Sequence, residues 1–108
     1  MVTPDDVKVA LLEVRLRIGL GRNRPWKRDA LSVRALAEGG LLTSDIWPTI
    51  RELRPDEYRS GPEPDDDPTR PPGDVWVFMP VLRGARLYVK LKLLCDDGTV
   101  ECCSFKLQ

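Results

Sequence analysis

Residues 86–107, "RLYVKLKLLCDDGTVECCSFKL", hold two alternating runs on either side of a short polar turn. Every second residue of the first run is apolar, and polar side chains stand between them: Arg86, Tyr88, Lys90 and Lys92. Because strand side chains alternate between two faces, this pattern predicts strands with one buried face and one polar face. The turn "DDG", with Gly98 in a left-handed conformation, predicts that the two strands form a hairpin.

The turn also predicts which residues of the hairpin stand opposite each other. A three-residue loop over 96–98 would pair residue 94 with 100, 92 with 102, 90 with 104, and 88 with 106. Tyr88 is then predicted to lie beside Lys106, and Lys90 beside Ser104. A slip by one residue would turn Lys106 toward the core, which the cost of burying a charge disfavours.

Three helices are predicted before the strands. The first begins after Thr3, a good N-cap followed by proline and two acids, and ends at Gly19 or Gly21. Apolar residues at helical spacing predict a second helix that ends at Gly39. Capping residues at 43–45 predict the start of a third.

The segment 59–74, "RSGPEPDDDPTRPPGD", contains five prolines and is predicted to be an extended loop. The apolar run "VWVFM" that follows predicts a strand. With helices first and strands last, we expect an α+β fold in which two to three helices pack on one face of a small C-terminal antiparallel β-sheet. The length of 108 residues predicts a single domain over 1–108.

The composition limits the classes of function. The chain is 42% hydrophobic and 31% charged, as in globular proteins, and it has no histidine. No apolar run reaches the roughly 18 residues that span a bilayer, and charges interrupt the N-terminal apolar residues, so we expect a cytoplasmic protein that binds no membrane. The three cysteines are predicted to be reduced thiols, because Cys102 and Cys103 are neighbours on a strand and point to opposite faces. A zinc site and histidine-dependent acyl transfer are not expected.

Two polar segments allow more than one interpretation. "PEPDDDP" at 62–68 could hold a divalent cation, but consecutive acids in a proline-rich loop are more often solvated, so we predict no metal and no cofactor. "RNRPWKRD" at 22–29 combines bases with Trp26, a pattern suited to RNA contact through Arg24, Lys27 and Arg28. The same segment could equally be ordinary surface with Trp26 in the core.

The polar face of the predicted hairpin carries groups that RNA cleavage requires. Attack by the 2′-hydroxyl needs a base, stabilisation of charge on the phosphorane, and an acid for the departing oxygen. Lysine, arginine and tyrosine can supply these functions, with arginine as a bidentate clamp on phosphate. Taken alone, the same alternation is also that of an ordinary solvated sheet face.

Four short motifs in order, "DEYRS", "WVF", "LYVKLKL" and "SFK", resemble the MqsR-type toxins of bacterial toxin–antitoxin systems. The preceding stretch "RDALSVRALAEGGLLTSDIWPTIRELRPDEY" is similar to the two central helices of that family, so the resemblance covers roughly residues 24–108. The resemblance implies a RelE-like fold, cleavage of mRNA as a metal-independent endoribonuclease, and a cognate protein antitoxin as partner.

Three family positions carry over to this chain as predicted catalytic residues. They are the basic residue of "EYRS", the tyrosine of "LYVK" and the lysine of "SFK", which fall on Arg59, Tyr88 and Lys106. Arg59 replaces a family lysine, and Val77 stands where the best-known form has a glutamine. The predicted RNA-binding residues are Lys90, Lys92, Arg86, Arg24, Lys27 and Arg28. Two alternatives are a non-catalytic RNA- or protein-binding module of the same fold and a nuclease that cuts mRNA only on the ribosome.

Overall fold

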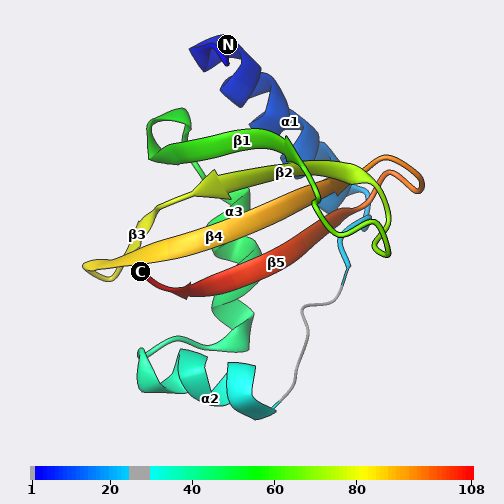
Figure 1. Cartoon of the computed structure of the whole chain (residues 1–108). Helices are drawn as coiled ribbons and strands as arrows, with labels where there is room; N and C mark the ends of the chain where they lie inside the picture. The colour runs from blue at the N-terminus through cyan, green and yellow to red at the C-terminus, as the bar shows by residue number, and fades with distance from the viewer. Residues whose placement is uncertain (1, 25–29) are drawn as a thin grey trace.

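The computed structural model describes residues 2–24 and 30–108 and confirms the α+β class. Helices occupy the N-terminal half, and five strands of the C-terminal half form an antiparallel sheet in the order β1-β2-β4-β3, with β5 paired to β4. Figure 1 shows the sheet in front of α1 and α3. The elements are α1 Pro4–Gly19, α2 Ala30–Glu38, α3 Ile46–Arg51, β1 Tyr58–Pro64, β2 Gly73–Phe78, β3 Val81–Leu82, β4 Ala85–Leu94 and β5 Val100–Leu107, with short 3₁₀ turns at Thr43–Asp45 and Pro55–Glu57.

The start of α1 is the capping arrangement that its first residues predict. The Thr3 hydroxyl accepts a hydrogen bond from the Asp6 backbone N–H at 3.2 Å, and the Asp6 carboxylate accepts one from the Thr3 N–H at 2.9 Å. The helix ends at Gly19, as expected. Its inner face is buried through Val7, Ala10, Leu11 and Val14.

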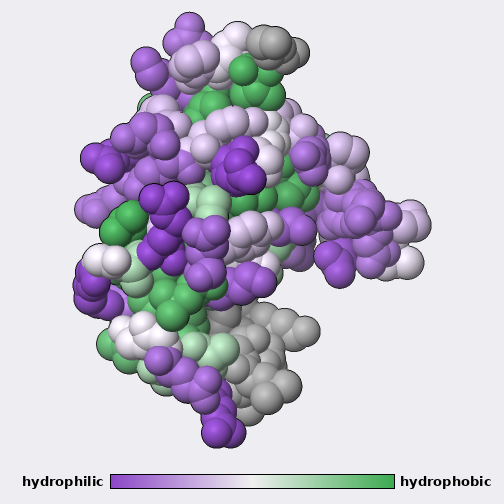
Figure 2. Space-filling view, turned by 60° about the vertical axis from the view of Figure 1, so that its left-hand side comes forward, coloured by the Kyte–Doolittle hydropathy of each residue, from purple (hydrophilic) through white to green (hydrophobic). Residues whose placement is uncertain are grey.

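The outer face of α1 is also apolar. Val9, Leu12 and Leu16, followed by Leu20 at the helix end, have exposed fractions between 56% and 65%. Figure 2 shows hydrophobic surface at the upper end of the molecule, where α1 lies. A helix with apolar residues on both faces buries one face against its own core and leaves the other for solvent or a partner.

The other two helices follow the predictions closely. α2 ends at Glu38 before the two glycines, and α3 begins after the 3₁₀ turn with Pro48 in its first turn, where proline removes no helical hydrogen bond. Ile46, Ile50 and Leu53 are fully buried on one face of this region. They join the central cluster that the helices form with β2, β4 and β5.

The hairpin of β4 and β5 confirms the pairing of Tyr88 with Lys106 and of Lys90 with Ser104. The predicted pairs nearer the turn are wrong, because 92 pairs with 101 and the Leu94 N–H donates to the Thr99 carbonyl at 2.9 Å. Next to the turn, each β4 residue therefore pairs with a β5 residue one position earlier than predicted. A bulge at Cys103 adds one residue to β5 and restores the expected register beyond it.

The prediction of a loop throughout 59–74 is wrong at its start, where β1 forms an edge strand paired with β2. Prolines are tolerated in an edge strand because the backbone positions that face solvent need no N–H group to bond to a neighbouring strand. Gly61 has a φ of +115°, and a Cβ there would stand 2.5 Å from the Val75 carbonyl oxygen, so this position requires glycine. Trp26, which could be a core residue or a surface residue, lies outside the described residues. Trp76 is buried in the core.

Candidate functional site

Tyr88 and Lys106 lie side by side on the sheet face opposite the core. Leu87 and Val89, the neighbours of Tyr88 along β4, are fully buried against the helices, so the alternation turns Tyr88 the other way. The Lys106 ammonium Nζ stands 5.3 Å from the centroid of the Tyr88 ring, within the range of a cation–π contact. Lys106 is exposed and Tyr88 half-buried, so a ligand on this face could reach both.

Two further cations flank this pair along β4. Arg86 and Lys90 are each two residues from Tyr88, about 7 Å along the strand, and share its face. Arg86 is exposed, and Lys90 is half-buried opposite Ser104. Four of the predicted site residues are therefore together on one surface, which we call the Tyr88 face: Arg86, Tyr88, Lys90 and Lys106.

A pocket of about 220 Å³ adjoins the Tyr88 face. Its lining combines Tyr88 and Lys90 with two valines of β2, with residues of β1, and with the two acids that begin the β1–β2 loop. Val77 contributes an apolar wall to this pocket. The acids in the lining are Glu63, Asp65 and Asp66.

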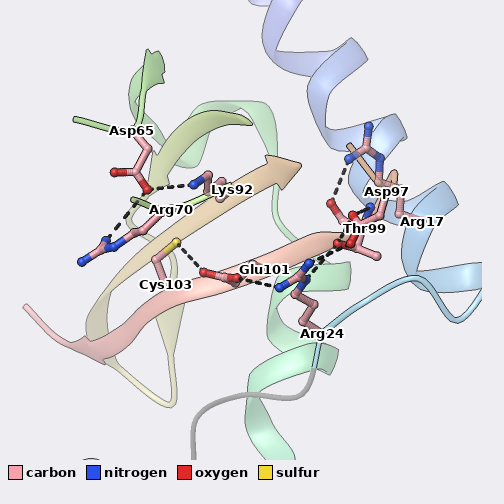
Figure 3. Close-up of polar contacts among 9 residues, drawn as sticks. All are labelled: Arg17, Arg24, Asp65, Arg70, Lys92, Asp97, Thr99, Glu101 and Cys103. Atoms are coloured by element: carbon pink, nitrogen blue, oxygen red, sulfur yellow. Dashed lines mark hydrogen bonds and ion pairs between the residues drawn. The ribbon is translucent and has the colours of Figure 1, made fainter. Parts of the chain in front are cut away.

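Lys92 is not the exposed cation that the alternation predicts. Its side chain is 2% exposed, and its Nζ lies 2.8 Å from the Asp65 carboxylate, as Figure 3 shows. Arg70 stands 3.9 Å from the same carboxylate. The proline-rich segment thus returns over this end of β4 and pairs Lys92 internally, so RNA could reach Lys92 only by displacing Asp65. Lys92 shares the face of Tyr88 as predicted, but its predicted exposure is wrong.

The hydrogen bond from Lys92 lowers the pKa of Asp65 below its usual value of 3.8, and the bond from the Asp67 backbone N–H adds to this. A lowered pKa in the folded state means that the carboxylate stabilises the fold above about pH 4 and loses that effect as the pH falls through the folded pKa. We expect Asp65→Asn to be less stable than the wild type at about pH 7, with a difference that shrinks below about pH 4. Urea denaturation at both pH values measures this, and a difference that does not change with pH would contradict it.

Arg59 stands apart from the other two predicted catalytic residues. It lies on the edge strand β1, whereas Tyr88 is on β4, two strand spacings away across β2, or about 10 Å between backbones. Arg59 is exposed, and the described residues show no hydrogen bond or ion pair from its guanidinium. The prediction that places Arg59 at the start of an extended loop is wrong, because Arg59 belongs to a paired strand.

Arg24, a predicted RNA-binding residue, already uses its guanidinium for contacts within the protein. Its guanidinium lies 2.7 Å from Asp97, 3.2 Å from the Thr99 hydroxyl and 3.9 Å from Glu101, and the bond to Asp97 raises the pKa of Arg24 (Figure 3). This cluster is at the turn end of the hairpin, about 20 Å along β5 from Lys106. Arg24 is therefore not part of the Tyr88 face, and Lys27 and Arg28 lie outside the described residues.

Nucleophilic chemistry by a thiolate has no support at this face. The three cysteines are free, with Cys95 exposed and Cys102 buried. Burial raises the pKa of Cys102 to about 12. Burial, and then the charge of Glu101, raise the pKa of Cys103 to about 11. Both of these thiols therefore stay protonated at neutral pH.

The acidic loop is used for internal bonds. Asp65 pairs with Lys92, and Asp67 accepts hydrogen bonds from the backbone N–H and the hydroxyl of Thr69. Within residues 2–24 and 30–108, no cluster of three or more potential ligands could hold a metal ion. Over the same residues, no helix is both long and apolar enough to cross a bilayer.

Comparison with known proteins found no match for this chain among family models, curated proteins or solved structures. The features of this chain that bear on function are therefore the geometry of the Tyr88 face and the residues that resemble the toxin motifs. Sequence reasoning missed Asp65 as the partner of Lys92. The acidic run was visible in the sequence, but nothing local indicates which of its carboxylates turns toward β4.

Proposed function

We propose that this protein is the toxin of a toxin–antitoxin system and cleaves mRNA on its Tyr88 face as a metal-independent endoribonuclease. The observation that carries the proposal is the cross-strand pairing of Tyr88 with Lys106, with the ammonium 5.3 Å from the ring. Two residues taken from separate toxin-like motifs thus meet on one exposed surface. Sheet faces that display aromatic and basic residues suit single-stranded RNA.

The proposed binding mode lays single-stranded RNA across the sheet. Arg86, Lys90 and Lys106 would contact phosphates, and one base would stack on the Tyr88 ring. Arg59, on the far side of β2, would clamp a phosphate further along the same strand of RNA. Because β2 separates β1 from β4, Arg59 would contact a different phosphate from the one beside Tyr88 and Lys106.

The proposed reaction is attack of the ribose 2′-oxygen on the adjacent phosphorus. A bond forms between O2′ and phosphorus, and the P–O5′ bond breaks with its electron pair on O5′. The ammonium of Lys106 stabilises the charge on the phosphorane and gives O5′ a proton, which solvent then replaces. The proton of the 2′-hydroxyl passes through the Tyr88 hydroxyl to water. The products are a 2′,3′-cyclic phosphate and a 5′-hydroxyl.

The toxin part of the proposal predicts growth arrest. Expression of the chain alone should stop growth of a bacterial host, and co-expression of a cognate antitoxin should relieve the arrest. A Lys106→Ala variant present at the same cellular level should be tolerated, because cleavage is expected to fall about 10²-fold. Growth curves with matched immunoblots measure this. Normal growth during expression of the wild-type chain would contradict the assignment as a toxin.

The separation of Arg59 from Tyr88 favours one alternative, a module of the same fold that binds RNA without cutting it. Purified protein that retains RNA in a binding assay but leaves it intact, with and without ribosomes, would establish that alternative. Cutting that requires ribosomes would identify a ribosome-dependent nuclease instead.

A further inference from the structure

A second and larger cavity, of about 620 Å³, lies between α1 and one end of the sheet. Its volume is within the range of sites that bind small molecules or the side chains of a partner. The wall is mostly apolar, with contributions from α1, β1, β2 and β4. The apolar lining residues are Val2, Val9, Ala10, Pro62, Trp76 and Leu93.

Trp76 in this wall has an unsatisfied polar group. The residue is 6% exposed, and its indole N–H is buried without an acceptor among the described residues. Buried N–H groups in native proteins are nearly always paired, but this one is covered by protein atoms, so an occupant of the cavity could supply the acceptor only if the Trp76 ring shifted. A backbone or side-chain carbonyl of the occupant would then accept the bond.

The polar part of the lining is acidic. Asp6, Glu13 and Asp74 line the cavity, and no basic residue does so within the described part of the chain. The carboxylate of Asp6 caps α1, and Glu13 pairs with Arg17 at 2.7 Å. Asp74 is exposed and has no ion pair with any described residue, so its charge remains available to a cation.

The cavity continues into the exposed apolar face of α1. Val9 belongs to both, and Leu12, Leu16 and Leu20 extend the apolar surface along the helix. The stripe from Val9 to Leu20 is about 16 Å long at the helical rise, which is longer than a small ligand.

We propose that this cavity and stripe form a docking site for an amphipathic, basic segment of a partner protein. The apolar face of the segment would cover the stripe and insert one side chain into the cavity. A carbonyl of the segment would accept the Trp76 N–H once the ring has shifted toward the cavity, and a lysine or arginine would pair with Asp74. Nucleic acid is disfavoured here because the carboxylates repel phosphate. The site is separate from the Tyr88 face, and the inference does not depend on RNA cleavage.

The test uses two synthetic amphipathic peptides, one of leucine and lysine and one of leucine and glutamate, with the full chain. The indole N–H signal of Trp76, assigned with Trp76→Phe, is followed by NMR during titration. The lysine peptide should shift this signal saturably, and the glutamate peptide should not. Asp74→Asn should weaken binding about fivefold, the scale of one exposed ion pair. The double variant Leu12→Ser, Leu16→Ser should abolish it.

Leu42→Ser is the matched control, because Leu42 is as exposed as Leu12 but does not line the cavity. It should bind the lysine peptide like the wild type. The proposal is overturned if the Trp76 signal does not move, if both peptides bind equally, or if the double variant binds as well as the control.

Discussion

Lys106→Ala is expected to slow RNA cleavage by about 10²-fold or more while the protein stays folded. Cleavage is expected to fall because the Lys106 ammonium is the proposed proton donor to O5′ and lies 5.3 Å from the centroid of the Tyr88 ring. Stability should change little, since Lys106 is exposed and makes no ion pair with a described residue. Cleavage rates of a labelled RNA, alongside thermal melts, measure both quantities.

Two other variants give this experiment its controls. Tyr88→Phe keeps the ring for stacking and removes the hydroxyl, so it should lose cleavage on a similar scale, about 10²-fold, and retain RNA binding. Lys8→Ala removes an exposed lysine from α1, away from the Tyr88 face, and should cut like the wild type. If Lys106→Ala remains folded and as active as Lys8→Ala, the reaction takes place elsewhere on the molecule.

Gly73→Ala is expected to cost about 3 kcal/mol of folding free energy or more, because the new methyl group has no space. A Cβ at residue 73 would stand 2.4 Å from the Leu93 carbonyl oxygen and 3.1 Å from the Leu94 Cα. These are backbone atoms of β4, so the clash can be relieved only if β2 and β4 separate. That pairing also positions Val77 against Lys90 beside the Tyr88 face.

Gly19→Ala is the matched control for this change. A Cβ at the end of α1 would meet no atom within 4 Å, so the substitution should leave the unfolding free energy unchanged or raise it by up to about 1 kcal/mol. Urea denaturation of the two variants gives the comparison. Equal stability of both would mean that β2 and β4 do not approach as closely at residue 73 as the structure indicates.

Local patterns in the sequence predict most of the fold. The cap at Thr3 predicts the start of α1, and alternation predicts the hairpin with its buried and polar faces. The pairing of Tyr88 with Lys106 is correct although the predicted register next to the turn is off by one residue. The bulge at Cys103 adds one residue to β5 and so offsets this shift, which keeps the apolar residues beyond it on the buried face.

The failures come from contacts between segments distant in the sequence. β1 has the composition of a loop and becomes a strand because the free edge of β2 accepts it. The burial of Lys92 depends on Asp65, 27 residues earlier in the chain, and no local pattern pairs them. The position of Arg59 relative to Tyr88 follows from strand order, which alternation does not specify.

We propose that the Tyr88 face cleaves RNA without a metal ion. To test this, the purified protein is incubated with single-stranded RNA in excess EDTA, without ribosomes, and the ends of the products are analysed. We predict fragments with 2′,3′-cyclic phosphate and 5′-hydroxyl ends, and their loss in the folded Lys106→Ala variant. Intact RNA after incubation with the folded wild-type protein, or the same fragments from the Lys106→Ala variant at an equal rate, would contradict the claim.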